Sequence, residues 1–156
     1  MFLLSKNPPA AEVWAWCEQW LAHLAKGDFV AAHAMIMPGS QWKWTPELIE
    51  ALITNCGSLG PDPSGRRYRV TPPDTATGKT YLDSLRIDPN DPIMTGDVHP
   101  RFPFCVWWSR KPPLPKVGMV HLNYPLNREW TPLVSAFDIL VWEDGLVLDL
   151  ERIDVM

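Results

Sequence analysis

The apolar residues in the first third of the chain recur at the spacing of helices. One apolar face runs from Val13 to Leu24 and follows two prolines, which suit a first helical turn because its N–H groups have no helical partner. Lys26 and Gly27 are typical of the end of a helix. Asp28 is then placed to cap a short second helix, so the pattern predicts a helical hairpin.

A third helix is predicted between Thr45 and Gly57. Thr45 provides a capping hydroxyl, Pro46 follows at the first helical position, and a glycine ends the apolar pattern. The residues expected on its buried face are Leu48, Ile49, Leu52 and Ile53. Up to this glycine the chain is therefore expected to be mainly helical.

The period of the pattern changes beyond this point. Short apolar runs are bounded by Pro, Gly, Asn and Asp, which predicts strands near 68–71, 80–87, 104–109, 117–124, 133–142 and 146–155. Helices followed by strands indicate an α+β fold. We therefore predict a single domain over 1–156, with three N-terminal helices in about 8–57 packed on a curved, mainly antiparallel sheet in about 66–156.

The strongest local signal is the Asp-Gly pair at 144–145 between two apolar runs, which is typical of a two-residue hairpin turn. This turn would place Asp138 directly opposite Glu151, with Asp149 diagonally adjacent and a bulge near Arg152. Like charges in opposite positions destabilise a sheet. The carboxylates therefore indicate a solvated face, an acidic recognition surface or, inside a closed pocket, a general acid and base.

The charge balance narrows the choice of partner. The chain has 14 Lys and Arg residues against 18 Asp and Glu residues, a formal net charge of −4, and no basic stripe. We therefore expect a protein partner with a basic surface and no nucleic acid. No apolar run approaches the length of a membrane span, so no membrane contact is expected.

The sequence carries no motif for catalysis or metal binding. The four histidines lack metal-binding spacing, and the nucleophile-elbow and nucleotide-binding glycine motifs are absent. Cys17, Cys56 and Cys105 lie far apart, which favours buried thiols in the reducing cytoplasm over a disulfide or a zinc site. We expect no cofactor and no metal, and a binding protein is favoured over an enzyme.

Nine tryptophans are a heavy load for 156 residues and indicate a contact surface as well as a core. Trp42 and Trp44 alternate before the third predicted helix. One of Trp107 and Trp108 must face the core while the other faces away, because neighbours on a strand point to opposite faces. The residues predicted to form a binding site are Glu129, Trp130, Asp138, Asp149 and Glu151.

Two segments near the end of the chain carry a resemblance. Residues 124–137 read YPLNREWTPLVSAF, and residues 148–156 read LDLERIDVM. Together they resemble the ending of an uncharacterised bacterial domain family that reads PLNGEWSDLTATF, followed by an LEDIHV-like terminus. Arg128, Pro132 and Asp154 stand where that family has glycine, aspartate and histidine. Some small bacterial domains of this kind are immunity proteins beside toxins, so the resemblance implies a non-enzymatic inhibitor.

A second function remains open. Helices, a Gly-Asp corner and then a meander of strands are similar to the opening of the NTF2-like fold, in which a curved sheet wraps around the helices. That resemblance implies an interior pocket that binds or isomerises a small apolar molecule, with one buried carboxylate as base. A domain that forms a homodimer through its sheet is the third possibility.

Overall fold

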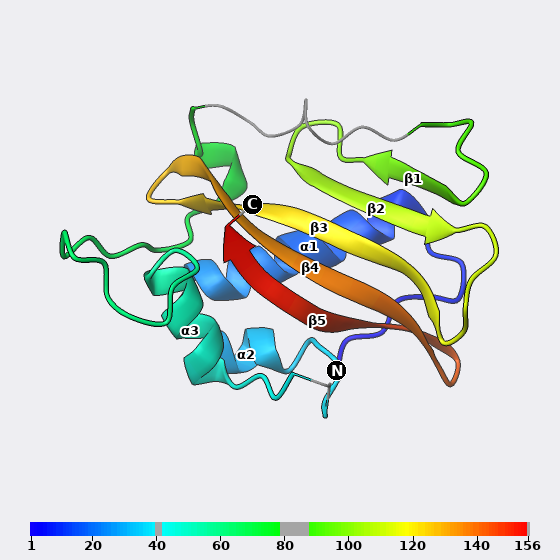
Figure 1. The fold of residues 1–156 in the computed structure, drawn as a ribbon, viewed down its shortest axis with the longest axis horizontal. Helices are drawn as coiled ribbons and strands as arrows, with labels where there is room; N and C mark the ends of the chain where they lie inside the picture. The colour runs from blue at the N-terminus through cyan, green and yellow to red at the C-terminus, as the bar shows by residue number, and fades with distance from the viewer. Residues whose placement is uncertain (40–41, 79–87, 156) are drawn as a thin grey trace.

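The computed structural model describes residues 1–39, 42–78 and 88–155, and in it three helices precede an antiparallel sheet (Figure 1). The helices are α1 (Ala10–Ala25), α2 (Phe29–His33) and α3 (Pro46–Thr54), with a short 3-10 turn η1 (Pro73–Thr75). The strands are β1 (Met94–Val98), β2 (Phe104–Ser109), β3 (Lys116–Leu126), β4 (Glu129–Trp142) and β5 (Gly145–Val155). The predicted α+β architecture is confirmed.

The helix starts follow from capping side chains. The Asp28 carboxylate accepts a hydrogen bond from the Ala31 N–H at 2.9 Å, and the Thr45 hydroxyl accepts one from the Leu48 N–H at 3.1 Å. Helix α2 is shorter than its apolar pattern predicts. Beyond its end the Met37 N–H donates to the Leu148 carbonyl at 2.9 Å, so the chain leaves the helix to bond along the edge of β5.

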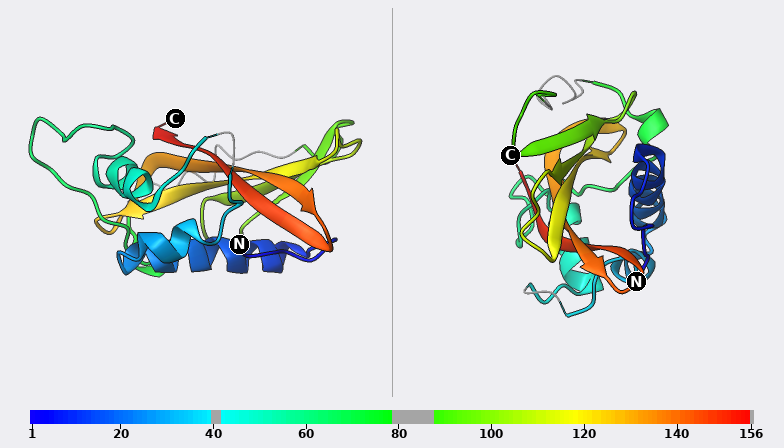
Figure 2. Two further views of the ribbon diagram at one scale, coloured as in Figure 1. Left: turned by 90° about the horizontal axis from the view of Figure 1, so that it is seen from below. Right: turned by 90° about the vertical axis from the view of Figure 1, so that its right-hand side faces the viewer.

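The sheet is an open meander in which each strand pairs with the next, in the order β1-β2-β3-β4-β5. Helix α1 runs along one face, while α2 and α3 lie beside it on the β5 side (Figures 1 and 2). Aromatic side chains fill the space between α1 and the sheet. The rings of Trp16 and Trp20 stack at 5.8 Å, and both meet the Phe137 ring edge-on, at 5.0 and 5.3 Å.

The turn of the last hairpin lies at 143–144, one residue earlier than predicted, so the predicted register is wrong by two residues. Gly145 does not lie in the turn but pairs with Trp142 inside the ladder. Only glycine suits that position, because a Cβ there would lie 2.4 Å from the backbone oxygen of Leu4. Leu4 is held there by a β-bridge to Leu146, the residue that follows Gly145. Asp138 consequently lies opposite Asp149 rather than opposite Glu151.

The predicted bulge near Arg152 is confirmed. The register of β4 and β5 shifts by one residue between the pair of Phe137 with Leu150 and the pair of Ala136 with Arg152. Glu151 is the extra residue at this shift, and its side chain is exposed.

The prediction of a strand at 68–71 is also wrong, because only a single bridge forms there, between Val70 and Leu126. The segment is held instead by side-chain bonds to the β3–β4 turn. Strand β1 was not predicted, since Gly96 and Asp97 are weak strand formers that take their conformation from pairing with β2. The strand predicted at 80–87 lies outside the described residues.

Within the three described ranges, no helix is long and apolar enough to cross a bilayer. The resemblance to the NTF2-like fold remains a prediction.

Candidate functional site

The sheet face turned away from α1, which we call the helix-free face, carries side chains in rows that cross the strands. Phe137 packs beneath α1, so its neighbour Asp138 points to the opposite face. The register places Trp107, Met119, Asp138 and Asp149 side by side on β2 to β5. The row therefore passes from an aromatic residue on one side of the sheet to two carboxylates on the other. Trp108 packs on the core instead, as predicted for this pair.

The charges on this face are largely arranged in pairs. The Lys116 ammonium lies 2.6 Å from the Asp138 carboxylate, and the Arg152 guanidinium lies 3.5 Å from Asp154. Exposed pairs of this kind contribute little stability, and they offset the negative charge that the sequence indicated. The helix-free face is therefore mixed in charge rather than uniformly acidic.

His121 lies in the next row and meets the Trp107 ring edge-on at 4.8 Å. Burial and, to a lesser extent, the nearby Arg152 guanidinium lower the pKa of this histidine to about 4, although Asp154 and Asp138 act in the opposite direction. The imidazole is therefore neutral near pH 7. It adds an aromatic ring, not a charge, to the helix-free face.

The structure does not bring the five predicted site residues together. Glu129 and Trp130 lie at the start of β4, nine residues and therefore roughly 30 Å along the strand from Asp138. Glu129 is exposed, but Trp130 is only 8 % exposed and packs near Phe102, with ring centroids 6.0 Å apart. Asp138, Asp149 and Glu151 form a separate group near the β5 side.

Glu151 borders a cavity of about 300 Å³ at the edge of the sheet. The cavity is lined by Trp42, Lys43, Trp44, Leu48, Glu151, Arg152 and Ile153. The Trp44 indole N–H donates to the Leu150 carbonyl at 2.6 Å, which fixes that ring against the strand. Trp42 is 57 % exposed. Sequence reasoning noted the alternation of these two tryptophans but had no signal that placed them beside Glu151.

The thiols and the remaining buried histidine do not offer reactive groups. Burial raises the pKa of Cys17 and Cys56 and raises that of Cys105 to about 12, so these thiols stay protonated. Burial lowers the pKa of His99. Its Nδ1 accepts from the backbone N–H groups of Arg101 and Phe102 at 3.0 and 2.9 Å, which is a structural role in a turn.

Among the described residues, no group of three His, Cys, Asp or Glu side chains is placed to hold a metal ion. The side chains that line the cavity at the β5 side include two tryptophan rings and three charged groups, Lys43, Glu151 and Arg152.

Comparisons of the chain with known protein families, curated proteins and solved structures found no significant match.

Proposed function

We propose that the protein is a non-enzymatic protein-binding domain, of the immunity type, that binds a basic partner at the β5 side of its sheet. The observation that supports this most directly is the position of Trp42, which stands largely exposed in the same cavity as the carboxylate of Glu151. An indole face beside a carboxylate suits a lysine or arginine side chain, which gains a cation–π contact and a charge pair together.

The cavity has the features of an anchor site. Leu48 and Ile153 give it an apolar lining, and the indole of Trp44 is already fixed by its hydrogen bond to β5. Large rigid aromatic side chains of this kind are enriched among the residues that dominate the energy of protein interfaces. Lys43 on the same rim provides a place for a carboxylate of the partner.

The helix-free face would supply the rest of the interface. Arg152 both lines the cavity and lies in a row of that face, opposite Ala136. The cavity is thus continuous with the carboxylates of Asp138 and Asp149. A cavity of about 300 Å³ holds one side chain, whereas a stable interface buries about 800 Å² on each partner, so both regions are needed.

An inhibitor of this type would act in the cytoplasm, where the three free cysteines would remain reduced. The alternative of an interior pocket for a small apolar molecule has no comparable support. The rings of Trp16, Trp20 and Phe137 occupy the space between α1 and the sheet in which such a pocket would lie.

The test is affinity purification of the C-terminally tagged protein from its native cells, beside the variants Glu151→Lys, Trp42→Ala and Glu129→Lys. We expect one stoichiometric protein partner that is lost at high salt and in the first two variants. Glu129→Lys reverses another exposed charge, at the far end of β4, and is the matched control, expected to retain the partner. Recovery of the protein alone, or of a second copy of itself, contradicts the proposal. Loss of the partner only in Glu129→Lys contradicts the assigned surface.

A further inference from the structure

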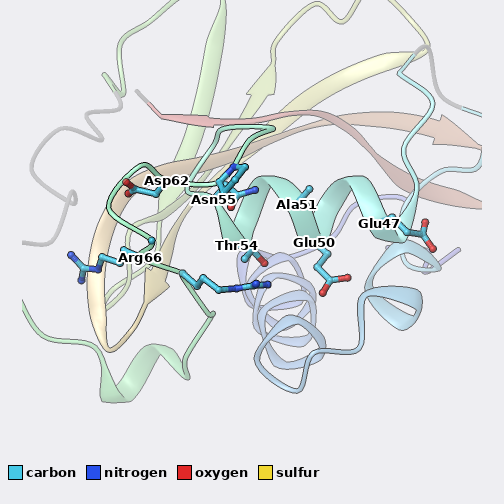
Figure 3. A pocket seen from close by; sticks show the side chains of 10 residues that line it. Glu47, Glu50, Ala51, Thr54, Asn55, Asp62 and Arg66 are labelled. Atoms are coloured by element: carbon cyan, nitrogen blue, oxygen red, sulfur yellow. The ribbon is translucent and has the colours of Figure 1, made fainter.

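Two adjoining cavities lie along α3 and share no lining residue with the cavity of Trp42 and Glu151, which we call the Trp42 cavity. The first, of about 470 Å³, lies between α3 and residues 61–67 (Figure 3). The second, of about 300 Å³, lies between α3, the α1–α2 corner and residues 67–70. Glu50, Thr54 and Arg67 line both cavities and therefore mark the junction between them. In Figure 3, Glu50 and Thr54 project from the same side of the helix.

The junction carries two opposite charges that do not pair with each other. Within the described ranges, neither Glu50 nor Arg67 has an oppositely charged group within 4.0 Å. Each of the two side chains is exposed to solvent. A site that presents an unpaired cation and an unpaired anion on one short rim is complementary to a ligand that carries both charges close together.

The backbone that carries Arg67 is fixed on both sides. The Tyr68 N–H donates to the Thr54 carbonyl at 3.0 Å, which ties the segment to the end of α3. The Asn127 side chain donates to the Arg67 carbonyl at 3.2 Å and accepts from the Arg69 N–H at 3.0 Å, which ties it to the β3–β4 turn. The backbone position of Arg67 relative to α3 is therefore set by the fold and not by a loose loop.

The second cavity has an apolar floor. It is formed by Leu24, Ile53 and Val70, which are at most 2 % exposed, while Phe29, Tyr68 and the charged Arg69 contribute to the walls. A volume of about 300 Å³ lies at the low end of the range for small-molecule sites, so it suits one side chain and not an extended ligand.

We propose that these adjoining cavities bind a free α-amino acid with an apolar side chain. Arg67 binds the α-carboxylate, Glu50 binds the α-ammonium group, and the side chain lies in the cavity floored by Leu24, Ile53 and Val70. A ligand that is only anionic leaves Glu50 without a partner, and one that is only cationic leaves Arg67 without a partner. A residue within a peptide chain lacks both charged groups.

This site is independent of the proposed binding of a basic protein. Leu48 of α3 faces the Trp42 cavity, whereas Glu47, Glu50, Ala51 and Thr54 of the same helix line the cavity in Figure 3. Because Arg67 and Glu50 are exposed, each charge pair adds little, and we expect a dissociation constant of about 1 mM.

The test is an NMR titration of the full chain with L-leucine and L-phenylalanine, followed by their N-acetyl and amide derivatives. We expect saturable shifts that centre on α3 and residues 66–70 for the free amino acids. Removing either ligand charge, or substituting Glu50→Gln or Arg67→Gln, is expected to weaken binding about two- to fivefold. Arg128→Gln is the matched control, because Arg128 is exposed at the same corner and lines neither cavity.

The proposal is overturned if neither amino acid gives saturable shifts up to about 20 mM, well above the expected dissociation constant. It is also overturned if the N-acetyl and amide derivatives bind as well as the free amino acids, a result that does not depend on any variant. Equal weakening by Arg128→Gln and Arg67→Gln would show only general charge attraction and would overturn the assignment of the carboxylate to Arg67.

Discussion

Along β4, consecutive residues meet opposite surroundings. Phe137 packs on Trp16 and Trp20 beneath α1, whereas Asp138 lies beside Lys116 on the face turned away from that helix. The first group is held by contact between buried rings, and the second by charges that remain accessible to water. The difference indicates that the rings of the helix-covered face hold the fold together, while the charged positions of the helix-free face can change without unfolding the protein.

The largest effect is expected from Phe137→Ala. The side chain is fully buried and meets two tryptophan rings, so its removal leaves a cavity that the large neighbours cannot fill. The free energy of unfolding should fall by about 3 to 5 kcal/mol, measured by urea denaturation. Val141→Ala, at an exposed position of the same strand, is the control. A loss below about 1 kcal/mol for Phe137→Ala would contradict this account of the core.

His121 should give a smaller and pH-dependent effect. Its pKa of about 4 in the folded protein lies below the value near 6.5 of an unfolded chain, so folding favours the neutral ring. The stability it contributes is complete above about pH 6.5 and is lost as the pH falls towards 4. We expect a loss of about 2 to 3 kcal/mol, since partial exposure to solvent reduces the full effect of the pKa difference.

Urea denaturation between pH 7 and pH 4 measures this loss, and His121→Gln should reduce its slope. His99 acts in the same direction, because burial also lowers its pKa, so the slope is not expected to vanish. An unchanged slope in His121→Gln would contradict the role given to this ring.

The smallest effect is expected from the pair of Lys116 and Asp138. The two side chains are 39 % and 24 % exposed, so their attraction is screened by water. A double-mutant cycle with Lys116→Ala and Asp138→Ala should give a coupling free energy of about 1 kcal/mol or less. A coupling as large as the loss in Phe137→Ala would remove the distinction between the two faces.

The parts of the fold that follow from local chemistry could be predicted from the sequence. Asp28 and Thr45 cap helices at the positions where their side chains suggested it, and the succession of helices and strands gave the architecture. The turn of the last hairpin was predicted one residue too far along the chain. Gly145 is required inside the ladder by its contact with Leu4, a residue far away in the sequence. Such contacts leave no local pattern.

The candidate site was less predictable than the fold. Trp42 and Glu151 border one cavity although more than a hundred residues separate them, and only the packing of α3 against β5 brings them together. Trp130 looked available in a polar sequence context, but it is buried by Phe102 and Phe104. Sequence patterns identify the residues able to bind, whereas tertiary packing decides which of them remain accessible.

The close approach of Leu4 to β5 has a consequence for self-association. Leu4 exchanges two backbone hydrogen bonds with Leu146, at 2.8 and 2.9 Å, and the Met37 N–H bonds to Leu148 further along the same edge. These contacts occupy backbone groups that an outermost strand would otherwise offer to another chain. Deleting the segment before α1 would expose the backbone groups of Leu146 beside the apolar residues of β5 and make this part of the edge a template for aggregation.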